Sequence, residues 1–217
     1  MTQDQIIEKT AEYVRQEFQN DSSGHDWWHI YRVWKNALTI CEYEKADVFI
    51  VQLAALLHDL DDWKFNPNGD ETPIRAKAWM KECGVDDVVA NHVCEIITHL
   101  SFKGADVKNK INSTEGMIVQ DADRLDAIGA IGVGRAFAYG GYKGRMMYDP
   151  DSPPQMHKSF EQYKNSQSAT INHFHEKLLL LKDRMNTATA KRIAEKRHEF
   201  MLQFLDHFMN EWEGKDL

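Results

Sequence analysis

An apolar run that ends in a histidine and three carboxylates constrains the fold of this chain more than any other feature. Leu53 to Leu57 are all apolar, and His58-Asp59-Leu60-Asp61-Asp62 follows directly. The apolar part is typical of a buried helix. Its end places a neutral nitrogen beside an anionic oxygen, and that pair suits a divalent cation. Such dipeptides are also common on solvated surfaces, so the rest of the chain has to supply partners.

Composition excludes several classes of protein. The 217 residues suffice for one sizeable domain. No apolar run approaches the roughly 20 residues that a membrane span needs. The first residues lack the basic stretch and apolar core of a secretory signal. The three cysteines are odd in number and lack C-x-x-C spacing, which favours a reducing cytoplasm over a disulfide framework.

The net charge of −8, from 26 basic and 34 acidic side chains, argues against binding a nucleic-acid polymer. It leaves room for a small anionic substrate that is held by a metal and a local basic patch. We therefore expect a small-molecule partner and no membrane association, and both a monomer and a homo-oligomer are compatible with the sequence.

Helical spacing of apolar residues dominates, and strand-like alternation is scarce. The chain is predicted to be all-α, a single domain over residues 1–217 built as a bundle of about eight or more helices. Segments 101–112 and 140–155 are expected to be irregular, and long loops of this kind often bind ligands. The predicted helices cover approximately residues 5–18, 25–43, 46–60, 73–83, 86–100, 113–139, 156–185 and 187–212.

Further metal ligands are expected on two of these helices. His29 lies on an apolar stripe, where a histidine is either a ligand or a hydrogen-bonded core residue. Asp121, Asp123 and Asp126 lie in an apolar segment, and three carboxylates there are costly unless they are paired or bind a metal. The alternatives are a partner such as Arg124, or stabilisation of helix-start carboxylates by the helix dipole.

Three strings in order resemble the HD-domain phosphohydrolases. They are Gly-His-Asp-Trp-Trp-His-Ile-Tyr-Arg-Val at 24–33, the His58-Asp59 pair, and Asp-Ala-Asp-Arg-Leu-Asp-Ala-Ile-Gly-Ala at 121–130. The string Ala-Phe-Ala-Tyr-Gly-Gly at 136–141 resembles a bacterial branch with nucleotide pyrophosphohydrolase activity. The resemblance covers about residues 20–145, with the C-terminal helices of about 156–213 expected to pack on that region.

The resemblance implies one divalent cation per chain, held by His29, His58, Asp59 and Asp123. Mn²⁺ is favoured, and Mg²⁺, Co²⁺ and Ni²⁺ are compatible with the same nitrogen and oxygen ligands. Asp126 is expected to orient a histidine from outside the ligand set. The catalytic residues are expected to be Asp62, as the proton-transfer group, and Lys64, which would neutralise developing charge.

Basic residues in the two irregular regions are expected to bind substrate phosphates. His99 is expected to contact a phosphate or a bound water, and Tyr139, Tyr142 or Trp28 could stack on a base, although core packing is favoured for Trp28. The basic residues are Lys103, Arg135, Lys143 and Arg145.

The predicted function is metal-dependent hydrolysis of (deoxy)nucleoside triphosphates to monophosphate and pyrophosphate. A 5′-nucleotidase or phosphodiesterase on the same metal is the alternative, and the released product separates the two. An HD-type di-iron oxygenase would need a fuller set of histidines. A non-catalytic nucleotide sensor would bind without turnover.

Overall fold

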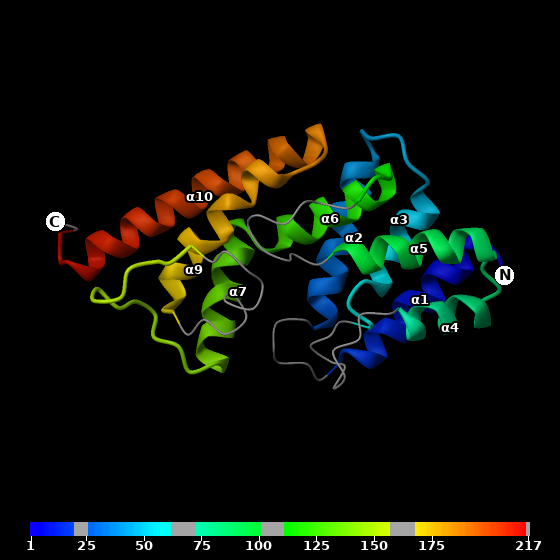
Figure 1. Ribbon diagram of the computed structural model, residues 1–217, viewed down its shortest axis with the longest axis horizontal. Coiled ribbons are helices and arrows are strands. Elements are labelled where there is room, and N and C mark those ends of the chain that lie inside the picture. The colour runs from blue at the N-terminus through cyan, green and yellow to red at the C-terminus, as the bar shows by residue number, and fades with distance from the viewer. Residues whose placement is uncertain (20–25, 62–72, 101–110, 157–167, 216–217) are drawn as a thin grey trace. The chain divides into compact units, whose positions relative to one another are not determined.

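The computed structural model describes residues 1–19, 26–61, 73–100, 111–156 and 168–215. Every regular element in these ranges is helical, which confirms the all-α prediction (Figure 1). The described residues divide into two compact units, the first up to Asp123 and the second from Arg124 onward. That the chain forms a single domain stays a prediction. Among these residues, none of the helices combines the length and the apolar character that crossing a membrane requires.

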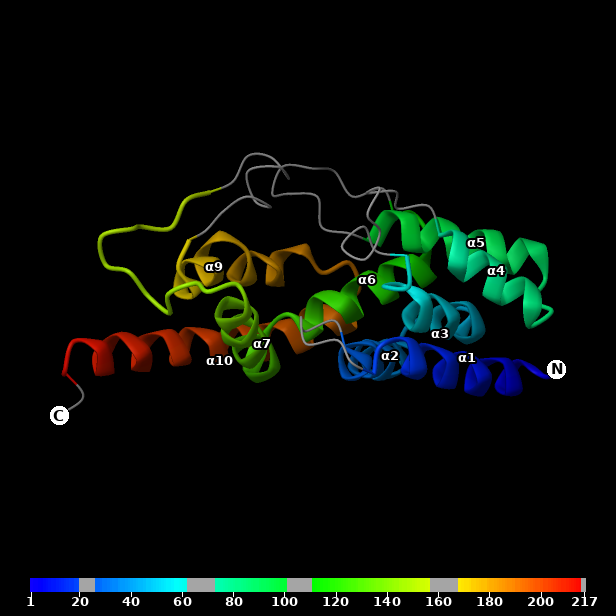
Figure 2. The same ribbon diagram turned by 90° about the horizontal axis from the view of Figure 1, so that it is seen from below.

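The first unit is built around α3. In Figure 2, α3 lies between the α4–α5 pair and the layer formed by α1 and α2, and it packs against α1, α2 and α5. Much of α6 also belongs to this unit. The helices are α1 (Gln3–Glu17), α2 (Trp27–Cys41), α3 (Val48–Leu57), α4 (Ile74–Glu82), α5 (Asp87–Leu100) and α6 (Thr114–Asp126).

The central position of α3 follows from its apolar sequence. All of its residues from 49 to 57 are buried except Gln52, whose amide oxygen accepts a hydrogen bond from the indole of Trp34 on α2. Asp47 caps the helix by accepting the N–H groups of Phe49 and Ile50. The backbone N–H of Asp47 also donates to the Glu115 carboxylate at 2.9 Å, which ties the start of α6 to α3.

The second unit packs around aromatic side chains. Its long α10 lies against α7 and the second of two 3₁₀ turns, and α7 also contacts α9. The elements are α7 (Gly129–Tyr142), α9 (Thr170–Glu176), η1 (Leu178–Leu180), η2 (Lys182–Arg184) and α10 (Ala188–Trp212). The aromatic cluster consists of Phe137, Tyr148, Phe174, Phe204, Phe208 and Trp212.

The single helix predicted over 113–139 is wrong, because the chain breaks between α6 and α7. Gly129 has a φ of +77°, a left-handed conformation that ends a helix and suits glycine. A Cβ at Gly132 would lie 2.3 Å from the carbonyl oxygen of Ala127, so that position also requires glycine. A periodic pattern does not show such a break, since apolar spacing continues across it.

The long helix predicted over 156–185 is also wrong in its described part. Residues 168–185 form α9 and two 3₁₀ turns, and residues 157–167 lie outside the described residues. The expected core role of Trp28 is wrong as well, since that residue is 57% exposed. The other predicted helices agree with the structure to within a few residues, including the stop at Gly84, whose φ is +74°.

Candidate metal centre

His29 is delivered by the first turn of α2. Asp26 caps this helix, and its carboxylate accepts the backbone N–H of His29 at 2.9 Å. The residue is only 2% exposed, so its imidazole lies inside the first unit rather than in solvent.

His58 and Asp59 follow the last residue of α3, where the buried helix gives way to a turn. The Nδ1 atom of His58 lies 2.9 Å from the carbonyl oxygen of Ala55. A carbonyl oxygen can only accept, so Nδ1 carries the proton and Nε2 of the neutral ring keeps its lone pair. Metal-binding histidines are commonly oriented by a bond of this kind.

Three buried side chains converge at this point. The Nε2 atoms of His29 and His58 are 3.3 Å apart. One oxygen of the Asp59 carboxylate lies 3.4 Å from Nε2 of His29, and the other lies 3.4 Å from Nε2 of His58. Ligands bound at about 2.1 Å to one cation are separated by roughly 3.0–3.5 Å, so these donor atoms fit a single ion. Within the described residues, His29, His58 and Asp59 form the group of potential metal ligands whose donor atoms all lie within 4.8 Å of one another.

Asp123 extends the cluster on its solvent side. Its carboxylate lies 3.6 Å from Nε2 of His29, and its side chain is 37% exposed. On α6, the preceding carbonyl of Ala122 accepts a bond of 3.4 Å from the Asn36 amide, which joins this part of the helix to α2. The structure thus brings together all four residues for which a ligand role is expected, three of them buried and one partly open to solvent.

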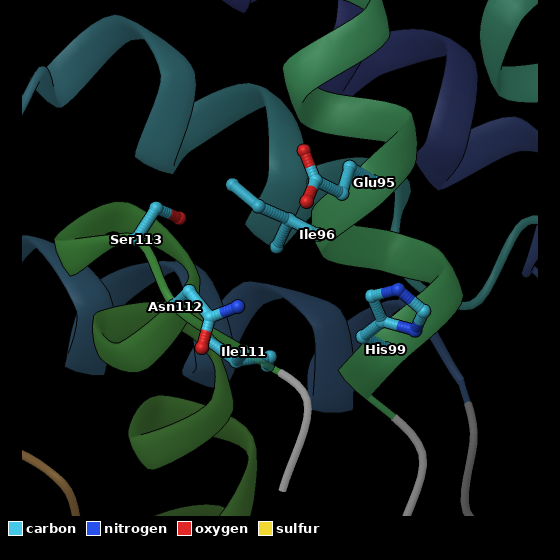
Figure 3. A pocket seen from close by; sticks show the side chains of 6 residues that line it. All are labelled: Glu95, Ile96, His99, Ile111, Asn112 and Ser113. Carbon is cyan, nitrogen blue, oxygen red and sulfur yellow. The ribbon is translucent and has the colours of Figure 1, made fainter.

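The two expected catalytic residues, Asp62 and Lys64, lie outside the described residues, as does Lys103. His99 lines a small, shallow pocket that is partly open to solvent (Figure 3). Glu95 and Ile96 of α5 and residues 111–113 before α6 complete its lining. A pocket of this size is compatible with a water contact at His99, and the phosphate contact stays a prediction.

The other expected substrate residues lie in the second unit. Nζ of Lys143 lies 5.7 Å from the ring centre of Tyr139 and 5.3 Å from that of Tyr142, and the Arg145 guanidinium is 5.7 Å from the centre of Tyr139. These contacts gather two cations and two exposed rings at the end of α7.

Arg135 forms an ion pair with the buried carboxylate of Asp126. Asp126 therefore has a cationic partner within the second unit, as the alternative considered for these aspartates requires. Its expected role in orienting a histidine stays a prediction.

Comparison with known proteins agrees with this geometry. The HD domain family matches residues 27–128. A Bacillus thuringiensis HD-superfamily hydrolase of known structure is 44% identical, with a TM-score of 0.77 over 98% of this chain and 99% of that chain. The chain belongs to the HD superfamily of hydrolases.

Two further similarities concern Bacillus subtilis YpgQ. This HD-superfamily chain is 44% identical to the uncharacterised protein YpgQ over 214 residues, which cover 96% of each sequence. The crystal structure of YpgQ in complex with ADP matches with 41% identity and a TM-score of 0.74, covering 95% of this chain and 100% of that chain.

Sequence reasoning missed two residues beside the site, Asp61 and Arg75. The Asp61 carboxylate accepts backbone N–H groups at the start of α4, and the Arg75 guanidinium donates to the Leu60 carbonyl. One signal was available, because a cation in the first turn of a helix opposes the helix dipole. Arg75 in the first turn of a predicted helix therefore calls for a partner elsewhere.

Proposed function

We propose that this HD-superfamily hydrolase is a metal-dependent phosphohydrolase that converts (deoxy)nucleoside triphosphates to monophosphates and pyrophosphate. The observation that carries the proposal is the convergence of His29, His58 and Asp59, with Asp123 at the open side. Two neutral nitrogens and carboxylate oxygens form a hard, mixed ligand set that suits Mn²⁺, the favoured ion, and also Mg²⁺, Co²⁺ or Ni²⁺.

A nucleotide substrate is supported by the similarity to YpgQ, which has been crystallised in complex with ADP. The two chains are similar over nearly their whole lengths, so a nucleotide is the first ligand to test here. ADP is a diphosphate. A site that binds ADP is compatible with cleavage of a triphosphate and also with release of phosphate from another nucleotide. The product assay below separates these reactions.

A divalent cation held at this site would supply a Lewis acid that polarises a phosphoryl oxygen and activates water. His29, His58 and Asp59 are buried and would hold the cation from the protein interior. Asp123 is the ligand beside solvent, so substrate phosphate approaches past it. Asp62 transfers the proton in this proposal, and Lys64 neutralises charge that develops on the phosphate.

The residues expected to bind substrate keep that role in the proposal. Lys143 and Arg145 contact triphosphate oxygens, and the nearby ring of Tyr139 stacks on the base. Arg135 supports this surface while it holds Asp126. His99 and Lys103 are proposed as further contacts to phosphate.

The decisive test is a panel of nucleotides incubated separately with Mn²⁺, Mg²⁺, Co²⁺ and Ni²⁺. Monophosphates and diphosphates are separated by chromatography, and phosphate and pyrophosphate are measured with independent coupled assays. His58→Ala and Asp59→Ala are expected to lower turnover at least a hundredfold, since each removes a ligand. The matched control is His207→Ala, which changes an exposed histidine on α10.

Monophosphate and pyrophosphate in equal amounts would support the proposal. Inorganic phosphate in place of pyrophosphate would indicate a 5′-nucleotidase on the same site. Hydrolysis of a phosphodiester, with neither phosphate nor pyrophosphate released, would indicate a phosphodiesterase. Nucleotide binding without any product would identify a sensor. Unchanged turnover in the His58 and Asp59 variants would place the chemistry elsewhere in the chain.

A further inference from the structure

The turn that carries His58 and Asp59 is fastened to α4 through Asp61. Its carboxylate oxygens accept the backbone N–H groups of Arg75 at 3.1 Å and Ala76 at 2.9 Å. The residue at the N-cap position of α4 is Pro73, which has no side-chain capping bond. The first N–H groups of a helix need acceptors, and an anion there also complements the helix dipole. Asp61 thus supplies the missing cap from a distant turn.

The side chain of Arg75 forms a second contact between α4 and the turn. Its Nη1 donates to the backbone carbonyl of Leu60 at 3.1 Å, and Leu60 is the residue between Asp59 and Asp61. Its Nη2 pairs with the Glu17 carboxylate on α1 and lies 3.5 Å from the Tyr13 hydroxyl. The guanidinium therefore bridges the metal-site turn to α1.

The charge of Arg75 is secured by these partners. Burial acts to lower the pKa of Arg75, but the hydrogen bonds to Glu17 and Tyr13 outweigh it and raise the pKa above its ordinary value. A cation in the first turn of a helix is otherwise unfavourable. The contacts of Arg75 with the Leu60 carbonyl and the Glu17 carboxylate explain why it occupies this position in α4.

We propose that Arg75 and Asp61 are positioning residues that fix the His58–Asp59 turn in the geometry needed to bind a metal. The inference rests on the metal site of the proposed function. Helical hydrogen bonding ends with α3 at Leu57, so the turn beyond it depends on other contacts. Arg75 binds the backbone carbonyl of Leu60, the residue directly after Asp59. The side chain of Asp61, the following residue, fastens the turn to the start of α4. Removing an outer partner of this kind typically weakens metal binding by about 10–100-fold.

The experiment measures Mn²⁺ affinity by titration calorimetry for the wild type, Arg75→Gln and Asp61→Asn, with the electron paramagnetic resonance spectrum of bound Mn²⁺ as a second readout. We expect each variant to bind Mn²⁺ about tenfold more weakly or worse, with a broadened spectrum. The matched control is Arg15→Gln, which removes an exposed arginine from α1 and is expected to leave affinity and spectrum unchanged.

Two measurements separate positioning from loss of fold. Melting curves of the metal-free proteins show whether each variant is folded at the titration temperature. Arg75→Lys keeps the charge but cannot bridge Leu60 and Glu17 together, so its affinity is expected to lie between those of the wild type and Arg75→Gln. If Arg75→Gln does not fold, Arg75→Lys and Asp61→Asn decide the outcome.

Wild-type affinity in the folded variants would overturn the inference, as would an equal loss in the Arg15 control. A wild type that binds Mn²⁺ but hydrolyses no nucleotide would defeat the proposed function and leave this inference standing. A wild type that binds none of Mn²⁺, Mg²⁺, Co²⁺ and Ni²⁺ would overturn both.

Discussion

The Nδ1 nitrogen of His58 donates a hydrogen bond to the carbonyl oxygen of Ala55, 2.9 Å away, and thereby leaves Nε2 facing His29 as an acceptor. The donor atoms of His29, His58 and Asp59 lie 3.3–3.4 Å apart, a spacing that suits one cation, so Mn²⁺ should stabilise the native state. At 100 times the dissociation constant, the expected gain is about 2.7 kcal/mol, reversible with EDTA. His58→Ala should lose the Mn²⁺-dependent shift in melting temperature, whereas His207→Ala should keep it. Equal shifts in the two variants would contradict a site at His58.

Breaking the Asp126–Arg135 pair should destabilise the protein. Asp126 is 1% exposed, so Asp126→Ala leaves a partly buried guanidinium without this carboxylate. The expected loss in the free energy of unfolding is about 3–5 kcal/mol, measured by urea denaturation. Glu82→Gln disrupts the exposed pair with Lys9 and should cost less than about 1 kcal/mol. Similar losses in the two variants would show that the Asp126 pair is not a buried structural contact.

Two glycines of α7 should respond to alanine in opposite directions. Gly129 has a φ of +77°, and an added Cβ would lie 2.9 Å from the Arg197 side chain, so Gly129→Ala should cost at least about 1–2 kcal/mol. Gly134 lies inside the helix with no heavy atom within 4 Å of an added Cβ. Gly134→Ala should therefore stabilise the protein by up to about 1 kcal/mol. Urea denaturation checks both, and a stabilised Gly129→Ala variant would refute the strained turn.

Removing the cations at the end of α7 should weaken nucleotide binding. Replacing Lys143 and Arg145 together with alanine is expected to raise KM for a nucleoside triphosphate about tenfold, with a smaller change in kcat, because charge-assisted bonds to phosphate are lost. Steady-state kinetics at saturating Mn²⁺ provides the measurement. A Lys191→Ala and Lys196→Ala double variant removes two exposed charges from α10 as a control. An unchanged KM would remove these two cations from the substrate site.

The cysteines should be poorly reactive in the folded protein. Burial, with a smaller contribution from Glu115, raises the pKa of Cys41 from 9.0 to about 11. Burial also raises the pKa of Cys83 and Cys94. At pH 8 the thiolate fraction of folded Cys41 is roughly a hundredfold below that of the unfolded chain. A chromogenic disulfide reagent should therefore react much faster in urea than in buffer.

The raised pKa values of the cysteines also make the stability of the protein depend on pH. A thiol whose pKa is raised by folding contributes stability that is fully present below pH 9 and declines as the pH rises through 9 toward 11. The melting temperature should therefore fall as the pH is raised from 8 to 11. Rapid native labelling at pH 8, or a melting temperature that rises over this range, would contradict the burial of these thiols.

Local patterns predicted the helices that are capped or stopped by short-range signals. The end of α4 is an example, because Cys83-Gly84 places glycine where the left-handed residue is needed. The break between α6 and α7 was missed because Gly129 lies in a run whose apolar spacing continues. Residues 168–185 have a similarly misleading pattern, and 3₁₀ turns share much of the α-helical spacing.

At the site, sequence spacing and family resemblance singled out His29, His58, Asp59 and Asp123, which the structure brings together. The Arg75–Leu60 and Asp61–Ala76 bonds were beyond reach, since no periodicity records which side chain caps a distant helix. Exposure of Trp28 was missed for a related reason. An aromatic residue next to a buried ligand on a helix faces a different direction, and only packing decides whether anything covers it.

The order of the proposed ligands along the chain has a consequence for biosynthesis. His29, His58 and Asp59 leave the ribosome well before α6, which carries Asp123. At roughly 5–20 residues per second, the earlier three exist for several seconds as an incomplete set. Capture of a cation by all four is therefore a late step in the life of the nascent chain, and a polypeptide truncated before α6 would release its metal more readily than the finished protein.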